Sequence, residues 1–436
     1  MRWTSRVLLL LMGWLALLMA QEPLTVSRAL EILRQQNLTL KQQEARLQQA
    51  QLQVEEQKTN LYPTLRFQGS FNYVSELASM EMAFPVPGLS PLTVQAGANH
   101  QYDLMALLEQ PVFTGFRLRH QVNMSRANFH QLQASKQAVE NQLCFRVRQL
   151  FLMMQLNHLQ GRAIAASRKR TVKNLEMVRN LYRAGQATRY DTMRVANRLL
   201  SLRAAQIRLT HQKEMLRTQL ETLLNYSPID SLQMFTLDEV NLTLQPQEVY
   251  LRQALANRPE LQQLHYQGEV ARFRQKMATS RYFPQIFASA SYHYARPGVN
   301  FFQREWMDYY TLGIHLQWEL WNWGRTGKQV QQASLAMEQT RLAQEQLRNT
   351  IRQEITEIYQ NLQNDLEQIE VKRQLLEQEK ERYRVTREKY RQGVATLVDL
   401  TDAEAALTRA DLQLRQAYVS FLIHQARMQM ATGGGQ

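Results

Sequence analysis

The sequence predicts a mainly α-helical fold with a small β part, built as two tandem helix-strand-strand-helix repeats. Three observations lead to this prediction: a ten-residue motif that occurs twice, two very long stretches without proline, and short segments in which apolar and polar residues alternate. The 436 residues are enough for two or three ordinary domains or for one elongated body.

The duplication is most direct at one motif. The segment YRAGQATRYD at 182–191 recurs 208 residues later as YRQGVATLVD at 390–399. Upstream, Pro63 matches Pro284 at a spacing of 221. The first copy therefore holds extra residues between these landmarks, and we expect them in a surface loop within 79–100, because loop lengths vary while their flanks stay in register.

Each copy contains two segments with the period-two pattern of a β-strand. Apolar and polar residues alternate from Leu65 to Tyr73 and from Tyr310 to Leu320, which gives a strand one apolar and one polar face. The expected strands are 64–74, 102–112, 285–295 and 309–320. Aromatic residues at strand ends, such as Trp318, are typical of a membrane interface. A strand of an ordinary sandwich would alternate in the same way.

Four strands are too few for a closed barrel, since even eight leave an interior only wide enough for side chains. Open strand edges are not tolerated in a bilayer, where no water satisfies their backbone groups. If the strands cross a membrane, several copies of the chain must share one barrel. Three copies would supply twelve strands, although the number three does not follow from the sequence.

Two long helices are predicted from the distribution of proline and glycine. Between Phe116 and Arg183 there is no proline and a single glycine, Gly161, and the matching stretch 325–392 holds only Gly327. A helix of roughly 65 to 70 residues is about 100 Å long. No globular core needs that length, so we expect a coiled coil or a helical tube.

Each long helix is followed by the same predicted turn. A glycine in the left-handed conformation ends the helix, and a threonine N-cap with an aspartate three residues later starts the next one. These residues are Gly185, Thr188 and Asp191 in the first copy, and Gly393, Thr396 and Asp399 in the second. Two helical hairpins are therefore expected.

The N-terminus predicts export. Arg2 and Arg6 precede an apolar run at 7–19, and Ala20 is followed by polar residues, as in a secretory signal peptide at residues 1–20. This run is too short for a membrane anchor. No later stretch is apolar enough for a transmembrane helix, so the exported chain is expected to be soluble in the periplasm or to cross an outer membrane as β-strands.

The composition argues against nucleic acid binding and catalysis. Lys and Arg total 52 against 38 Asp and Glu, a net charge of +14. The basic residues are spread along helical segments among Gln and Glu, which favours solvated helix faces over a phosphate-binding surface. The single cysteine, Cys144, allows no intrachain disulfide and no multi-cysteine metal site. No hydrolase, metalloprotease or nucleotide-binding motif occurs, so neither an enzyme nor a cofactor is expected.

Several motifs occur in a specific order, and most occur twice. They are Tyr62-Pro63 and Phe283-Pro284 before the first strands, the segments 111–115 and 319–324 after the second strands, 257–261 at the start of the second copy, and the paired Tyr-x-x-Gly turns. In this order they resemble the TolC-type outer-membrane efflux family over nearly the whole mature chain. The repeats would then span residues 21–225 and 250–432, with an equatorial linker at 226–249, a possible short strand at 233–237 and a tail at 433–436.

The resemblance implies a homotrimer in the outer membrane, with a lipid-embedded twelve-stranded β-barrel and a long periplasmic tunnel of helices. Such a channel is the passive exit duct of a tripartite efflux or type I secretion system. It works with a periplasmic adaptor protein and an energised inner-membrane transporter. The main alternative is a periplasmic coiled-coil adaptor or scaffold without a pore, but an adaptor has one helical hairpin where this chain has two.

The resemblance also assigns roles to residues at the two turns. The hairpin tips that dock the adaptor would be Tyr182, Gly185, Thr188, Gly393 and Thr396. The gate at the periplasmic end would be Asp399, Asp402, Tyr390 and Asp191.

One basic member of the family's gate is missing, because its position is Ala395; Arg189 or Arg391 is a hypothetical substitute. Asp399 and Asp402 stand three apart on one helix face. Threefold symmetry would bring like carboxylates together, which raises their pKa and favours a bound cation. The alternative is that Asp399 only caps the helix and Asp402 is solvated.

Overall fold

The computed structural model describes residues 23–82, 92–229, 231–234 and 240–434. The predicted signal peptide lies outside the described residues, as does part of the possible strand at 233–237. The described residues of that strand, Gln233 and Met234, are not in a strand; the preceding Leu232 forms an isolated parallel bridge with Leu24.

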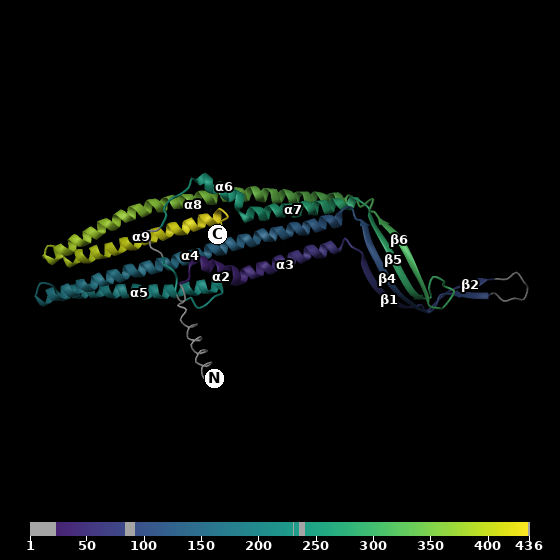
Figure 1. Ribbon diagram of the computed structural model, residues 1–436, viewed down its shortest axis with the longest axis horizontal. Helices are drawn as coiled ribbons and strands as arrows, with labels where there is room; N and C mark the ends of the chain where they lie inside the picture. Colours follow the sequence, from purple (N-terminus) through teal and green to yellow (C-terminus); the bar gives the residue numbers. More distant parts are fainter. Residues whose placement is uncertain (1–22, 83–91, 230, 235–239, 435–436) are drawn as a thin grey trace, which may run out of the picture. The chain divides into compact units, whose positions relative to one another are not determined.

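The described chain divides into two compact units, each treated by itself below. The helical unit comprises residues 23–45, 134–261 and 346–434, and the sheet unit comprises residues 46–133 and 262–345. In chain order the elements (Figure 1) are α2 Val26–Gln36, α3 Leu38–Thr59, β1 Thr64–Tyr73, β2 Ala78–Met82, β3 Leu92–Ala96, β4 His100–Phe113, α4 Arg117–Arg183, α5 Arg189–Leu224, α6 Gln247–Asn257, α7 Pro259–Thr279, η2 Ser280–Tyr282, β5 Gln285–Arg296, β6 Met307–Gln317, α8 Arg325–Arg391 and α9 Leu397–Ala431.

The sheet unit contains one four-stranded antiparallel sheet in the order β1-β4-β5-β6. The two inner strands, β4 and β5, come from different repeats. The outer strands β1 and β6 have no further strand beside them within the described residues. Their unpaired backbone groups are two open sheet edges, of the kind that pairs with another strand.

One face of this sheet is apolar and exposed. A single rung across the four strands joins Leu65, Leu108, Ala290 and Leu312. Leu65 and Leu312 are 74% and 75% exposed, and other apolar residues along the same face are exposed as well. Water-soluble sheets bury such a face against a core, so an apolar face left open indicates a surface for lipid or for another protein.

The opposite face is polar and carries one ion pair and one histidine–carboxylate contact. Arg66 lies 3.3 Å from Glu109, and the Nδ1 atom of His293 lies 3.1 Å from Asp103. The alternation predicted for these strands therefore separates an apolar face from a polar one, as expected.

All four predicted strands form the main sheet, as β1, β4, β5 and β6, but the region 79–100, expected to be a loop, contributes a further pair of strands. Strands β2 and β3 pair antiparallel, with Met80 opposite Val94. The last expected strand, 309–320, also starts earlier and stops at Gln317. Consequently Trp318, Trp321 and Trp323 follow β6 instead of ending it.

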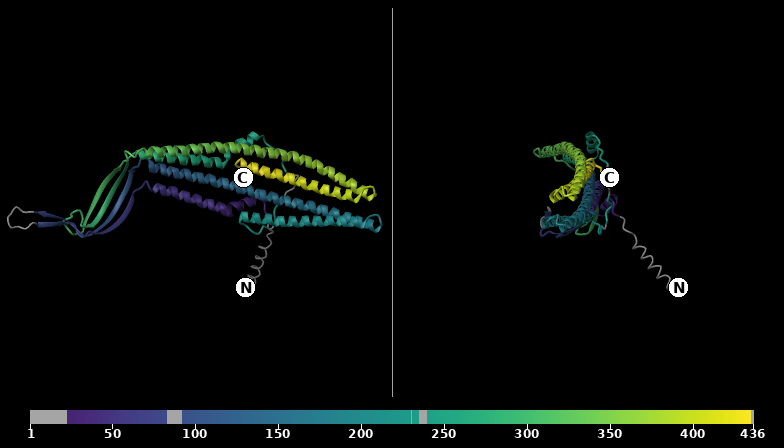
Figure 2. Two further views of the ribbon diagram at one scale, coloured as in Figure 1. Left: turned by 180° about the vertical axis from the view of Figure 1, so that it is seen from behind. Right: turned by 90° about the vertical axis from the view of Figure 1, so that its left-hand side faces the viewer.

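The two predicted long helices are confirmed, since α4 and α8 each have 67 residues. In the helical unit, α5 lies alongside α4 and α9 alongside α8 (Figures 1 and 2). Within the described residues, none of the helices has a segment apolar enough to pass through a membrane.

Three apolar clusters hold the helical unit together. The first joins α2, α4 and α5 and includes Leu33 and Leu220. The second joins both hairpins near the turns and includes Val178 and Leu400. The third joins α6, α8 and α9 around Phe421. Because the second cluster takes residues from all four long helices, the two hairpins pack on each other within one chain.

Candidate functional site

The two helical turns adopt the same predicted geometry. Gly185 and Gly393 have φ of 74° and 75°, in the region where glycine carries no steric penalty. In the second turn the amide of Asp399 donates to Oγ1 of Thr396 over 3.2 Å, and Oδ2 of Asp399 accepts from the amide of Thr396 over 2.9 Å. Thr188 and Asp191 form the same reciprocal pair in the first turn.

Within one chain, the capping hydrogen bonds favour the charged form of the Asp399 carboxylate. The side chain and backbone of Thr396 both hydrogen-bond to its carboxylate, and these bonds lower the pKa of Asp399. Both hydrogen bonds go to Oδ2, so Oδ1 remains for solvent, a cation or a second chain. Asp402 is exposed on the same helix. The two aspartates proposed for the gate therefore both present carboxylate oxygen atoms to the surface of this chain.

The structure brings Tyr390 and Asp191 together from different hairpins. Tyr390 is 9% exposed and belongs to the cluster that joins the hairpins. Burial raises its pKa, and the negative charge of Asp191 raises it further. The phenol of Tyr390 is therefore held neutral beside the first turn of α5.

The equivalent tyrosine of the first copy has a different environment. Tyr182 stands 208 residues before Tyr390, yet it is 47% exposed. In the same way Asp191 faces Tyr390, while its equivalent Asp399 faces no tyrosine within the described chain. Only one of the two equivalent tyrosine–aspartate pairs therefore forms within the chain, and Tyr182 and Asp399, the residue types of the other pair, are both exposed.

The hypothetical substitutes for the missing basic gate residue do not meet Asp191. Arg391 pairs with Glu388 over 3.5 Å on its own helix. Arg189 is exposed and makes no ion pair within the described residues. Ala395 packs against the apolar cluster that joins the hairpins.

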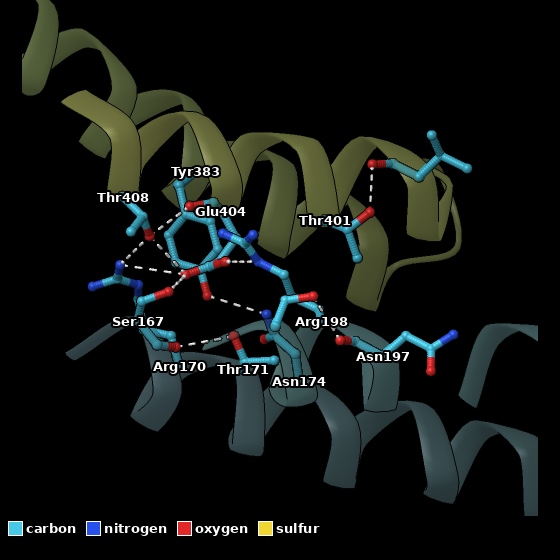
Figure 3. A network of polar contacts seen from close by, with 12 residues as sticks. Ser167, Arg170, Thr171, Asn174, Asn197, Arg198, Tyr383, Thr401, Glu404 and Thr408 are labelled. Atoms are coloured by element: carbon cyan, nitrogen blue, oxygen red, sulfur yellow. Dashed lines mark hydrogen bonds and ion pairs between the residues drawn. The ribbon is translucent and has the colours of Figure 1, made fainter. Parts of the chain in front are cut away.

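A second polar centre, which the sequence analysis missed, lies further along the hairpins (Figure 3). Glu404 on α9 is 2% exposed. Its Oε1 accepts a hydrogen bond from the Ser167 hydroxyl over 2.6 Å and lies 3.4 Å from the guanidinium of Arg170, both on α4. Its Oε2 lies 3.4 Å from Nε of Arg198 on α5. One carboxylate thus holds three helices together.

Further groups surround this carboxylate. Oγ1 of Thr408 lies 3.0 Å from Oε1 of Glu404 and 3.1 Å from Nη2 of Arg170. The guanidinium of Arg170 also lies 5.9 Å from the ring centre of Tyr383 on α8, a cation–π contact. All four helices of the two hairpins therefore contribute to the Glu404 network, defined here as Ser167, Arg170, Arg198, Tyr383, Glu404 and Thr408.

The Glu404 network has no counterpart at the positions that the internal duplication makes equivalent. The positions 208 residues from Glu404 and Arg170 are Ala196 and Gln378, which cannot form an ion pair. The sequence does contain a signal for the burial of Glu404, because this residue stands four residues after Leu400 and three before Leu407. A carboxylate among apolar residues at helical spacing is a candidate for burial with a partner.

The described part of the chain offers no candidate metal centre. No group of three His, Cys, Asp or Glu side chains could hold a metal ion among the residues described. Cys144 is buried, and burial raises the pKa of its thiol, which disfavours the reactive thiolate.

Comparison with known proteins gives consistent matches. The sequence model described as outer membrane efflux protein matches residues 29–226 and 250–434. No curated protein sequence matches the chain significantly.

Among solved structures, the chain is similar to CusC, with a TM-score of 0.79 and 16% identity over 94% of this chain and 92% of that one. For VceC of Vibrio cholerae the TM-score is 0.77 and the identity 16%, over 94% and 96%. For the open state of the Neisseria gonorrhoeae MtrE outer membrane channel they are 0.75 and 17%, over 94% and 89%. At these low identities the likeness establishes the fold.

Proposed function

This chain belongs to the outer membrane efflux protein family, and from that premise we propose that it is the passive exit duct of a tripartite efflux or type I secretion system. Efflux through the outer membrane is the role of the family. The finer assignment, to a duct that docks a periplasmic adaptor and an energised inner-membrane transporter, is our proposal.

The two-faced open sheet is the observation that carries the proposal. Its apolar face is exposed on all four strands, and its polar face carries the pairs Arg66–Glu109 and Asp103–His293. An apolar outside and a polar inside are what a channel wall in a lipid bilayer requires. A periplasmic scaffold without a pore has no use for the exposed apolar face, so the alternative considered from the sequence is disfavoured.

The open edges of β1 and β6 support assembly from several copies. In a bilayer, both edges need partner strands, and β1 of one copy and β6 of another can supply them. Three copies would give a barrel of twelve strands from β1, β4, β5 and β6. The exposed Tyr182 fits this assembly, because a neighbouring copy would offer Asp399 to it, as Asp191 is offered to Tyr390 within the chain.

The helical turns are proposed as the periplasmic entrance. A ring of Asp399 and Asp402 from three copies would narrow it and favour cations, and the contact between Tyr390 and Asp191 would hold it closed. The exposed tip residues Tyr182, Gly185, Thr188, Gly393 and Thr396 are proposed to dock the adaptor. Catalysis plays no part in this role, since family and fold are those of channel proteins.

Single-channel recording on the purified mature protein tests the proposal. Detergent-solubilised protein with the mass of a trimer is added to one side of a planar bilayer. We expect discrete conductance steps, together with cation selectivity that is reduced in a variant carrying Asp399→Asn and Asp402→Asn. A soluble monomer or dimer that never inserts would overturn the duct. Unchanged selectivity in the variant would overturn the aspartate ring alone.

A further inference from the structure

The positive charge of the chain is spread along helices, as described above, but most of it lies on the first hairpin. Residues 161–224 contain 14 Lys and Arg but only 4 Asp and Glu, a net charge of +10. The equivalent segment of the second copy, 369–432, contains 11 basic and 9 acidic residues, a net charge of +2. Most of the surplus of +14 therefore lies on one of two structurally equivalent hairpins.

On α4 the excess charge includes an exposed stripe, which we call the basic stripe: Arg162, Lys169 and Lys173. The separations of seven and four residues place these side chains on one helix face. All three are exposed, whereas Ser167 and Thr171 between them are buried against the second hairpin. None of the three makes an ion pair with any residue that the structure describes. The stripe is therefore charged, solvated and unneutralised.

The second hairpin carries the opposite charge at the same positions. The residues 208 positions after the basic stripe are Glu370, Glu377 and Glu381, and all three are exposed. Glu176, the one acidic residue of α4 near the stripe, is likewise replaced by a basic residue, Arg384. Each charge has thus changed sign between two helices of equal length and fold.

The two stripes also differ in how far they are neutralised. Each glutamate on α8 pairs with a basic residue three positions later, Glu377 with Lys380 over 2.7 Å and Glu381 with Arg384 over 2.6 Å. The corresponding positions after Arg162 and Lys169 are Ala165 and Val172. Lys173 is followed three positions later by Glu176, but the described chain shows no ion pair between them, so the α4 stripe keeps unpaired charge.

We propose that the basic stripe of α4 docks an acidic helix of a periplasmic partner protein, and that the inverted and internally paired stripe of α8 does not bind this helix. The inference rests on the proposed function, which places the hairpins in the periplasm, and it adds how a partner tells two similar hairpins apart. The stripe spans twelve residues, with an axial rise of about 16 Å between its two ends, and its spacing suits a second helix with acidic residues at matching heptad positions. The equivalent positions of α8 are glutamates that pair on their own helix, so that face offers an acidic helix no complementary charge.

A second copy of this chain is a poorer occupant of the stripe. Its complementary residues would be Glu370, Glu377 and Glu381, but these already pair on their own helix, and the hairpin that carries them is net positive. An acidic helix of another protein, with no basic residue three positions after each carboxylate, has its carboxylates free to pair with the basic stripe.

The test uses two labelled helical peptides and the detergent-solubilised full-length protein. One peptide carries glutamates at positions i, i+7 and i+11, and the other carries lysines there. Binding is followed by fluorescence anisotropy at about 50 and 300 mM NaCl, a range over which screening of exposed charges increases strongly. The variants are the triple change Arg162→Glu, Lys169→Glu and Lys173→Glu, and the matched triple change Glu370→Lys, Glu377→Lys and Glu381→Lys.

We expect wild-type protein to bind the acidic peptide at least about tenfold more tightly than the basic one at low salt, with the difference shrinking at high salt. The α4 variant should lose this preference, and the α8 variant should bind about twice as many acidic peptides per chain. Equal binding of both peptides by the wild type overturns the proposal. So does dissociation of the α4 variant into monomers, since the stripe would then join copies of the chain.

Conductance of the same preparations separates this inference from the proposed function. Both variants keep folded helices, checked by circular dichroism, because all six side chains are exposed. If channels form normally while peptide discrimination is absent, only the docking surface is wrong. If no channel forms in the wild type, the duct is wrong whatever the peptides do.

Discussion

The buried carboxylate of Glu404 leads to an asymmetric prediction. Its side chain is 3% exposed, whereas those of Arg170 and Arg198 are 28% and 30% exposed. Replacing both arginines with methionine leaves a charged group inside the protein without its cations. Replacing Glu404 with glutamine leaves two cations that can turn toward water.

The magnitudes follow from this difference in exposure. An uncompensated buried charge costs about 3–5 kcal/mol. The Glu404→Gln variant keeps contacts with Ser167 and Thr408 and loses charge-assisted bonds, which is worth about 1–2 kcal/mol. We therefore expect the double arginine variant to destabilise the contact between the hairpins considerably more than Glu404→Gln does.

Hydrogen exchange of the backbone amides in α9 measures the effect where it occurs. A loss of about 3 kcal/mol corresponds to a decrease in protection of roughly 150-fold near Leu400 and Leu407. Arg168→Met is the matched control, because Arg168 on α4 makes an exposed hydrogen bond, to Gln206, among the described residues. The reasoning is refuted if the double variant exchanges like this control, or if Glu404→Gln is the more damaging change.

Three further predictions concern single positions. Gly393→Ala should destabilise the second turn by about 1–2 kcal/mol through its positive φ, whereas Gly161→Ala inside α4 should stabilise by about 0.5–1 kcal/mol; unfolding midpoints in denaturant compare the two. Leu312→Lys on the apolar face should destabilise the membrane-inserted protein by about 2–4 kcal/mol if it lies at mid-membrane, and Thr311→Lys on the polar face by much less. The yield of protein refolded into vesicles measures the difference. Capping lowers the pKa of Asp399, so the stabilisation by its carboxylate should be complete above the unfolded-state pKa of about 4 and be lost as the pH falls through the folded-state pKa. The amide protection of the wild type relative to Asp399→Asn should therefore shrink between pH 6 and pH 3. A protection ratio that stays constant with pH would contradict this.

The sequence predicted the features that depend on neighbouring residues. The turn at Gly393 is local, since it needs only a glycine, a threonine and an aspartate at fixed spacing. The length of α8 follows from the absence of proline, and the sheet faces follow from alternation. The duplication strengthened each inference, because two copies give the same answer.

The features that the sequence did not predict depend on long-range packing. Glu404 is a buried ion-pair residue only because α4 and α5 of the other hairpin supply Arg170 and Arg198, more than 200 residues away. The hairpin of β2 and β3 consists of strands of five residues each, which is too short for a clear alternation. The uneven charge of the hairpins was present in the sequence but becomes meaningful when equivalent helix faces are compared.

The central claim is that the open sheet of one chain closes with the sheets of two others. Disulfide cross-linking of the edges tests it most directly, in a background with Cys144→Ala. Gln68→Cys on β1 is combined in turn with Thr311→Cys, Gly313→Cys and His315→Cys on β6, and the protein is oxidised in membranes. The account predicts covalent dimers and trimers, and no larger species, for at least one combination. Monomers throughout, or a ladder that continues beyond three, would contradict it.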